Sequence, residues 1–152
     1  NVVVTRTFSK AYGLAGARVG WAEAPGWMVP SLYAARGMGP VNGFAQAAAA
    51  AGLDDQEIVD ARVAEIVEER ARVTGVLRQM GLEVVESATN FLLVAPGPDA
   101  AAAEAAVDAL FDAAGILVTL SREAGLEKYY RISLGLPEQN DLLIATLRDL
   151  PG

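Results

Sequence analysis

The N-terminal part of the chain alternates short apolar runs with glycine and proline. The run NVVVT is rich in β-branched residues and predicts a buried strand, and ARVGWAEA predicts a second short strand. The segment AYGLAG contains two glycines, which favours a turn between these strands. The next stretch, PGWMVPSLYAARGMGPVNG, holds three prolines and four glycines, and it therefore predicts a loop with one or two helical turns.

From Phe44 onward the apolar residues recur at helical spacing. FAQAAAAAGL has strong helix propensity. DDQEIVDARVAEIVEERARVTGVLRQMG begins with acidic residues and ends at Gly81, which predicts a long amphipathic helix. Its predicted apolar stripe consists of Val59, Val63, Ile66, Val73 and Leu77. We expect its acidic residues to form a solvated face rather than a metal site; they include Glu65, Glu68 and Glu69.

The C-terminal part mixes strand and helix patterns. LEVVES, NFLLVAP, ILVTL and YYRISLG predict strands. DAAAAEAAVDALFDAAG predicts a helix that ends at Gly115, with Val107, Leu110, Phe111 and Ala114 facing inward. PEQNDLLIATLRDL predicts a closing helix with Pro137 in its first turn and with Asn140 as a capping or packing residue. Residues from about 45 onward therefore predict an α+β or α/β domain.

Composition narrows the possible functions. The 152 residues carry a net charge of −7, and 53% of them are hydrophobic, which predicts a folded acidic domain rather than a nucleic-acid binder. The chain contains neither cysteine nor histidine, so it lacks disulfides, Cys- or His-based zinc sites and His-based triads. The longest apolar run is too short to span a bilayer, and the lack of cysteine is consistent with the cytoplasm. Because the chain opens without methionine inside a predicted strand, we expect it to be part of a longer protein.

Lys10 is the residue whose type and neighbours point most clearly to a chemical role. It lies between a strand-like run and a glycine-rich turn, with Thr7 and Ser9 before it and Arg18 after it. An amine becomes a nucleophile when burial or a neighbouring cation favours its neutral form, and two hydroxyls with a guanidinium can bind a phosphate. This combination suits pyridoxal phosphate, whereas a solvated surface lysine is the alternative reading. The Gly-x-x-x-x-Gly-Lys order of a P-loop is absent.

The longer motif TFSKAYGLAGARVGW resembles the lysine motif of class I/II aminotransferases of pyridoxal-phosphate fold type I. RTFSKAYGLAG is most like the histidinol-phosphate aminotransferase branch. VNGFAQAAAAAGL, ATNFLLV and YYRISLGLPEQNDLLIATL also resemble segments of that branch, so the similarity covers nearly the whole chain. The resemblance implies an α/β fold in which residues 1–44 end the cofactor-binding large domain and residues 45–152 form the small C-terminal α+β domain.

By position, the resemblance also implies functional roles. Lys10 matches the lysine that binds the cofactor aldehyde as a Schiff base and then transfers a proton. Thr7, Ser9 and Arg18 match phosphate-binding positions. Arg131 matches the arginine that binds the substrate α-carboxylate, and Asn90 matches a position near the active site that we assign to substrate binding.

The residues around Arg131 by themselves leave three interpretations open. Strand alternation places Arg131 and Ser133 on the face opposite Tyr130, Ile132 and Leu134. An arginine within an apolar strand needs a partner, so a bound carboxylate, a structural ion pair and an exposed strand face are all open from the residues alone. The resemblance favours the carboxylate.

The resemblance implies transamination between an amino donor and 2-oxoglutarate by a homodimer, with histidinol phosphate in histidine biosynthesis as the expected substrate. One position departs from that branch, because Thr119 occurs where an arginine usually meets the substrate phosphate, and Arg122 follows three residues later. An aromatic amino-acid aminotransferase or a related phosphate-substrate lyase is therefore an alternative. The family's pyridine-binding aspartate lies upstream of this segment, so we expect the chain alone to be inactive; a non-catalytic, partner-binding remnant is the alternative from another class.

Overall fold

The computed structural model describes residues 1–37 and 39–150. The chain divides into two compact units, the first being Asn1–Val63 and the second beginning at Ala64. The division falls within a long helix, whereas the domain boundary expected between residues 44 and 45 stays a prediction. Within the described residues, no helix is both long and apolar enough to cross a membrane.

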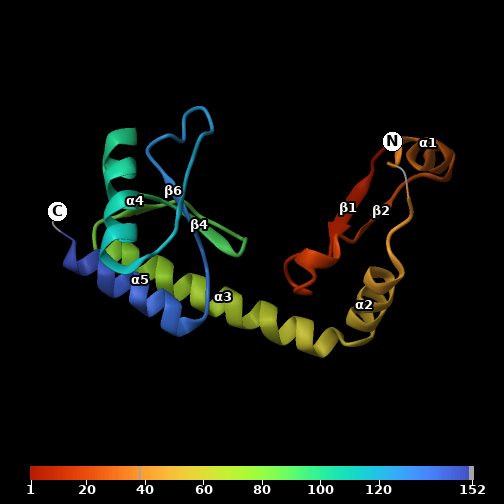
Figure 1. Cartoon of the computed structure of the whole chain (residues 1–152), viewed down its shortest axis with the longest axis horizontal. Coiled ribbons are helices and arrows are strands. Elements are labelled where there is room, and N and C mark those ends of the chain that lie inside the picture. The colour runs from red at the N-terminus through yellow and green to blue at the C-terminus, as the bar shows by residue number, and fades with distance from the viewer. Residues whose placement is uncertain (38, 151–152) are drawn as a thin grey trace. The chain divides into compact units, whose positions relative to one another are not determined.

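The first unit begins with an antiparallel two-stranded ribbon of β1 (Val4–Thr7) and β2 (Gly20–Glu23) (Figure 1). The short 3-10 helix η1 (Ala15–Ala17) lies in the connection. A second 3-10 helix, η2 (Gly26–Met28), and α1 (Val29–Ala35) are the predicted helical turns. The predicted helix near Phe44 is α2 (Gly43–Asp54), which begins with Asn42 accepting a hydrogen bond from Ala45 N at 2.8 Å.

The expected burial of the first strand is wrong. All residues of β1 and of β2 are exposed. The reason is that the ribbon has only two strands, and an isolated pair of strands buries little surface. The β-branched composition of NVVVT therefore predicts the strand but not its surroundings.

The second unit is a four-stranded antiparallel sheet whose one face is covered by helices. The strand order is β3 (Glu83–Val84), β4 (Phe91–Ala95), β6 (Tyr130–Ser133) and β5 (Thr119–Leu120). The helices are the C-terminal part of α3 (Gln56–Gln79), α4 (Ala100–Ala114) and α5 (Pro137–Asp149). β3 and β5 are each two residues long, which is shorter than the predicted strands LEVVES and ILVTL.

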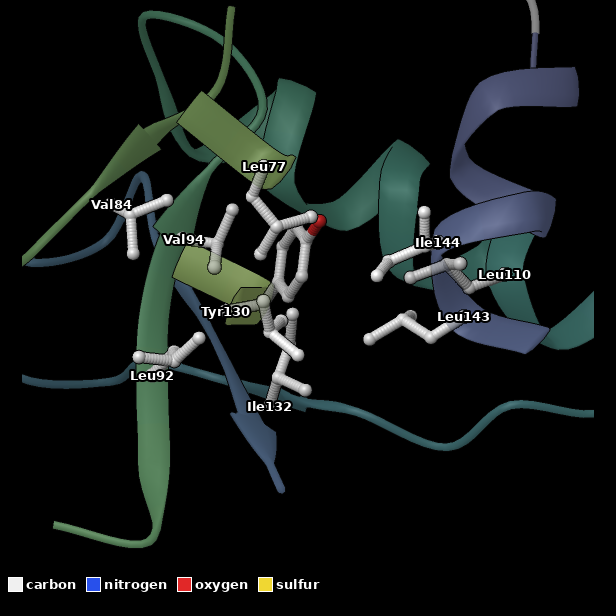
Figure 2. Packing of buried hydrophobic residues seen from close by; sticks show 10 residues of the cluster. Leu77, Val84, Leu92, Val94, Leu110, Tyr130, Ile132, Leu143 and Ile144 are labelled. Atoms are coloured by element: carbon white, nitrogen blue, oxygen red, sulfur yellow. The ribbon is translucent and has the colours of Figure 1, made fainter. Parts of the chain in front are cut away.

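The core lies between this sheet and the three helices. Figure 2 shows Tyr130 surrounded by Leu77 from α3, Val94 from β4 and Ile144 from α5. The predicted alternation along β6 is confirmed, because Tyr130 and Ile132 are buried while Arg131 and Ser133 are exposed. The buried cluster consists of Val73, Leu77, Val84, Leu92, Val94, Leu110, Tyr130, Ile132, Leu143 and Ile144.

Two residues expected to face inward are exposed. Val63 is 41% exposed, because the described elements leave this part of α3 uncovered. Phe111 is 53% exposed, whereas its neighbour Leu110 is fully buried. The buried face of α4 is centred on Ala103 and Leu110. Adjacent helix residues are about 100° apart, so Phe111 points away from this buried face.

Asn140 is a packing residue, as predicted, and it connects the start of α5 to α3. Its side chain accepts a hydrogen bond from Gly135 N at 3.0 Å, and it donates to Gly135 O at 3.1 Å and to Glu69 Oε1 at 2.9 Å. Arg72 donates to both oxygens of Glu69, at 2.9 and 2.6 Å, and contacts Asp141 at 2.8 Å. The Arg72 guanidinium, aided by the Asn140 amide, lowers the pKa of Glu69.

The acidic residues of α3 thus behave differently from one another. Glu65 and Glu68 are exposed, as expected of a solvated helix face. Glu69 is half-buried in the network around Asn140, so its expected place on that face is wrong. Sequence periodicity places it beside the apolar stripe, but it does not show that Asn140 in the first turn of α5 adds a polar partner in addition to Arg72.

Among the buried side chains of the described residues, one polar atom lacks a hydrogen-bond partner. It is the hydroxyl oxygen of Tyr130. Replacing Tyr130 with Phe should raise the free energy of unfolding by about 1 kcal/mol, because an unsatisfied buried hydroxyl is removed and the ring stays. Urea unfolding at neutral pH measures this. A loss of stability would mean that the hydroxyl has a partner in solution.

The same variant should respond differently to alkaline pH. Burial raises the pKa of Tyr130 to about 12, while an unfolded tyrosine ionises near 10. The neutral hydroxyl's contribution is therefore fully present below pH 10 and is lost as the pH rises from about 10 to 12. Over this window the wild type should lose stability faster than Tyr130→Phe, and parallel curves would contradict the assignment.

Candidate functional site

The first group of candidate residues lies in the connection between β1 and β2. Lys10 is exposed and begins a tight turn that is closed by Gly13 N donating to Lys10 O at 2.8 Å. Gly13 has a φ of 69°, a conformation that favours glycine. Leu14 N then donates to Phe8 O at 2.9 Å, and Phe8 is only 4% exposed. The turn therefore carries Lys10 outward above a buried phenylalanine.

Two hydroxyls lie immediately before this turn. Thr7 Oγ1 donates to Ser9 Oγ at 2.9 Å, and Ser9 N donates back to Thr7 Oγ1 at 3.1 Å. Such local bonds let a side chain hold the backbone where a strand ends. The arrangement keeps both hydroxyl oxygens together next to Lys10.

Arg18 reaches the same end of the ribbon from the other strand. Thr7 pairs with Gly20, and Phe8 N donates to Val19 O at 3.2 Å, so the pairing continues one residue beyond β1. Arg18 precedes Val19 and lies next to this last pair. Gly20 permits the close pairing, because a Cβ there would lie 2.5 Å from Arg6 O. Sequence reasoning did not single out this glycine, since its requirement comes from the partner strand.

The backbone of Arg18 is strained. Its φ of 54° and ψ of 51° place it in the left-handed region, and among the described residues it is the one non-glycine residue with a positive φ. Its Nη1 donates to Ala15 O at 2.8 Å, which fastens the side chain across η1. Strain of this kind persists where surrounding structure imposes it and is concentrated at functional sites.

The second group lies on the sheet face that the helices leave uncovered. Arg131 in β6 pairs with Leu93 on one side and with Thr119 on the other. Its guanidinium carbon lies 5.5 Å from the centre of the Phe91 ring, a cation–π contact. Phe91 was missed by sequence reasoning, because strand register rather than any motif brings it to Arg131.

Asn90 lies at the end of the same strand pair. Asn90 O accepts a hydrogen bond from Leu134 N at 3.0 Å, so its backbone extends the pairing of β4 with β6 beyond Phe91. Its side chain is half-buried. Arg122 is exposed in the connection between β5 and β6. Thr119, and not Arg122, is thus the residue aligned with Arg131.

A shallow cavity of about 170 Å³ adjoins this face. Phe91 and Leu93 form its floor, and the segment from Val85 to Thr89 forms its rim. Ser87 Oγ donates to Phe91 O at 2.7 Å and lies 2.9 Å from Thr89 Oγ1, which holds the rim in place. The cavity shares Phe91 with the cation–π contact of Arg131.

The structure therefore brings the candidates together as two groups. Thr7, Ser9, Lys10 and Arg18 share one end of the ribbon in the first unit. Asn90 and Arg131 share one sheet in the second. In chemical terms, the first group offers an amine, two hydroxyls and a guanidinium, and the second offers a guanidinium beside an aromatic ring.

The chain belongs to the class I and II aminotransferase family, whose family model matches residues 1–147. It is 41% identical over 150 residues to the histidinol-phosphate aminotransferase of Jannaschia sp. (strain CCS1), in an alignment that covers 99% of this chain and 41% of that protein. The expected family membership is confirmed, and the chain spans about two fifths of the length of that relative.

Solved structures share the fold. The crystal structure of histidinol-phosphate aminotransferase from Sinorhizobium meliloti in complex with pyridoxal-5'-phosphate matches with a TM-score of 0.89 and 36% identity, over 99% of this chain and 42% of that one. L-threonine-O-3-phosphate decarboxylase from Porphyromonas gingivalis matches with a TM-score of 0.79 and 28% identity, over 97% of this chain and 46% of that one. The predicted fold, part of a fold type I transferase, is confirmed.

Proposed function

We propose that this chain is the lysine- and arginine-bearing part of a pyridoxal-phosphate-dependent aminotransferase that acts on histidinol phosphate. The observation that carries the proposal is the group at the end of the ribbon, where Lys10 stands beside the paired hydroxyls of Thr7 and Ser9 and the strained Arg18. The similarity to histidinol-phosphate aminotransferases along 99% of the chain supports the substrate. Since the chain covers about two fifths of those proteins, the activity is that of a longer protein.

The donor set fits pyridoxal phosphate. A phosphate needs several hydrogen-bond donors and a positive charge, which the exposed Thr7 and Arg18 and the half-buried Ser9 supply. An aldehyde needs an accessible amine, and Lys10 is exposed on the adjoining turn. When bound, the cofactor supplies an electron sink that makes the substrate Cα–H bond acidic.

Each residue then has a defined task. Thr7, Ser9 and Arg18 bind the cofactor phosphate and so fix its position. Lys10 would hold the cofactor aldehyde through Nζ, and the same amine, when free, would carry the proton from the substrate Cα to the cofactor carbon C4′. Arg131 binds the α-carboxylate that amino donor and 2-oxo acid share, with its guanidinium supported by the Phe91 ring. Asn90 contributes to the substrate side of the site.

Partners and location belong to the same proposal. The small-molecule partners are the amino donor and 2-oxoglutarate, and the whole protein is a homodimer. The lack of cysteine fits the reducing cytoplasm. The acidic net charge of −7 argues against nucleic acid as a partner.

Thr119 supports a second candidate substrate. It is aligned with Arg131 across β5 and β6 and carries no charge. A neutral residue there gives a substrate phosphate no ion pair, and it suits an aromatic side chain better. Transamination of an aromatic amino acid is therefore the alternative.

The Lys10 assignment predicts where the cofactor becomes fixed. Borohydride reduction of the protein, expressed from its full natural reading frame and loaded with pyridoxal phosphate, should attach the cofactor to Lys10. The only other lysine in this chain is Lys128, which is paired with Glu83 at 2.5 Å and serves as the matched control. Lys10→Ala should abolish attachment and turnover, and Lys128→Ala should leave both intact. Peptide mapping that finds the cofactor elsewhere would overturn the assignment.

Arg18 should show opposite effects on stability and on cofactor affinity. Arg18→Gly relieves a left-handed conformation and should raise the free energy of unfolding by up to about 1 kcal/mol. It also removes a cation from the phosphate, which should weaken cofactor binding by roughly tenfold or more. Thermal unfolding without cofactor and a cofactor titration measure the two effects. Unchanged affinity would show that Arg18 is purely structural.

Substitutions of the two residues aligned on the sheet, Arg131 and Thr119, should change the steady-state kinetics in different ways. Arg131→Ala should impair both half-reactions, because donor and acceptor each lose their carboxylate partner. Thr119→Arg should raise kcat/KM for histidinol phosphate by about an order of magnitude if the substrate phosphate lies there, because a charge-assisted contact is gained. Phenylalanine turnover should stay flat or fall. An equal change for both substrates would place Thr119 away from the substrate side chain.

A further inference from the structure

Tyr12, two residues after Lys10, is held on three sides within the first unit. Its ring lies 4.7 Å from the ring of Phe8, at an interplanar angle of 58°. A methyl group on Gly52 in α2 would lie 3.1 Å from Tyr12 Cδ1, so only a glycine leaves the ring its present room. The Tyr12 hydroxyl donates to Gln56 Oε1 at 3.3 Å at the start of α3.

The acceptor for Tyr12 is itself oriented. Gln56 Nε2 donates to Asp60 Oδ1 at 2.8 Å, one helical turn later. An amide whose nitrogen faces a carboxylate presents its oxygen in the other direction, towards Tyr12. The hydroxyl of Tyr12 therefore meets an acceptor rather than a competing donor.

The backbone of Tyr12 is part of the turn that presents Lys10. This turn runs over residues 10–13 and is closed by the bond from Gly13 N to Lys10 O at 2.8 Å. A four-residue turn has few free dihedral angles, so a displaced ring at its third residue moves the first. We propose that Tyr12 is a positioning residue for Lys10 and that Gly52 sets the place of its ring.

The surroundings allow the ring to move without unfolding the unit. A cavity of about 230 Å³ is lined by Tyr12, by Gly52 in α2 and by residues of α3 that include Ile58 and Arg62. This space lies next to both Gly52 and Tyr12, so a new methyl group and a shifted ring have room. Gly52→Ala should therefore fold, since Ala also favours helix over Gly, yet carry Lys10 in an altered position. The positioning of Lys10 by Tyr12 is independent of the proposed function, and only the chemical role of Lys10 rests on that function.

The test uses the protein expressed from its full natural reading frame and compares Gly52→Ala with Gly43→Ala. Gly43 lies in the same helix, and a Cβ there meets no atom within 4 Å. The primary measurement needs no cofactor: limiting acetic anhydride labels amines, and mass spectrometry gives the acetylation of Lys10 relative to Lys128. The second measurement is the absorption maximum of the protein loaded with pyridoxal phosphate and the pH midpoint of that absorption.

Gly52→Ala should change the Lys10-to-Lys128 acetylation ratio by roughly threefold or more, the scale that a small displacement of a reacting group produces. It should also shift the absorption midpoint, while Gly43→Ala changes neither. In a Tyr12→Ala background Gly52→Ala should have no further effect, because the ring that it displaces is gone. A Gly52→Ala ratio equal to wild type, or an undiminished effect in that background, would overturn the proposal.

Two further outcomes are separable. If Gly52→Ala fails to fold, Gln56→Leu and Tyr12→Phe remove the hydroxyl bond without adding bulk, and wild-type acetylation ratios in both would overturn the proposal. If the wild type fixes no cofactor on Lys10, the proposed function fails, but the acetylation ratios still decide whether Tyr12 positions Lys10.

Discussion

The antiparallel pairing of β4 with β6 is the interaction on which the second unit depends. It buries Leu92 and Val94 against Tyr130 and Ile132 on one face, and it places Leu93 beside Arg131 on the other. A shift of register by one residue would exchange the two faces, burying a guanidinium and exposing the core. The same pairing that forms the core therefore also fixes where the carboxylate-binding candidate lies.

Sequence patterns predicted local structure well where a single segment decides it. The periodicity of α3, the alternation around Arg131 and the glycine-rich turn after Lys10 each follow from a few neighbouring residues. Burial was harder to predict, as Val63 and Phe111 illustrate, because the exposure of a side chain depends on which other element packs against it. The contacts of Phe91 with Arg131 and of Gly20 with Arg6 depend on register between strands, which no single segment specifies.

The two candidate groups were predicted by different routes. The hydroxyls and Lys10 stand close together in the sequence, so both the chemistry and the family resemblance pointed to them. Arg131 lies more than a hundred residues later, and there only the resemblance favoured carboxylate binding over the other interpretations, so its role stays a prediction. Arg131 is aligned with Thr119, so the two side chains lie on one face of adjacent strands. This alignment gives a physical reason to question whether the distal group of the proposed substrate is a phosphate.

Asn140 illustrates how much can depend on a single nitrogen atom. Its amide presents an oxygen to Gly135 N and a nitrogen to Glu69, and an aspartate of nearly the same shape would present oxygen to both. Spontaneous deamidation, a slow hydrolysis that cells cannot reverse by refolding, would then set two carboxylates against each other 2.9 Å apart. The junction between β6 and α5 is thus a place where chemical ageing turns an attraction into a repulsion without any change of size.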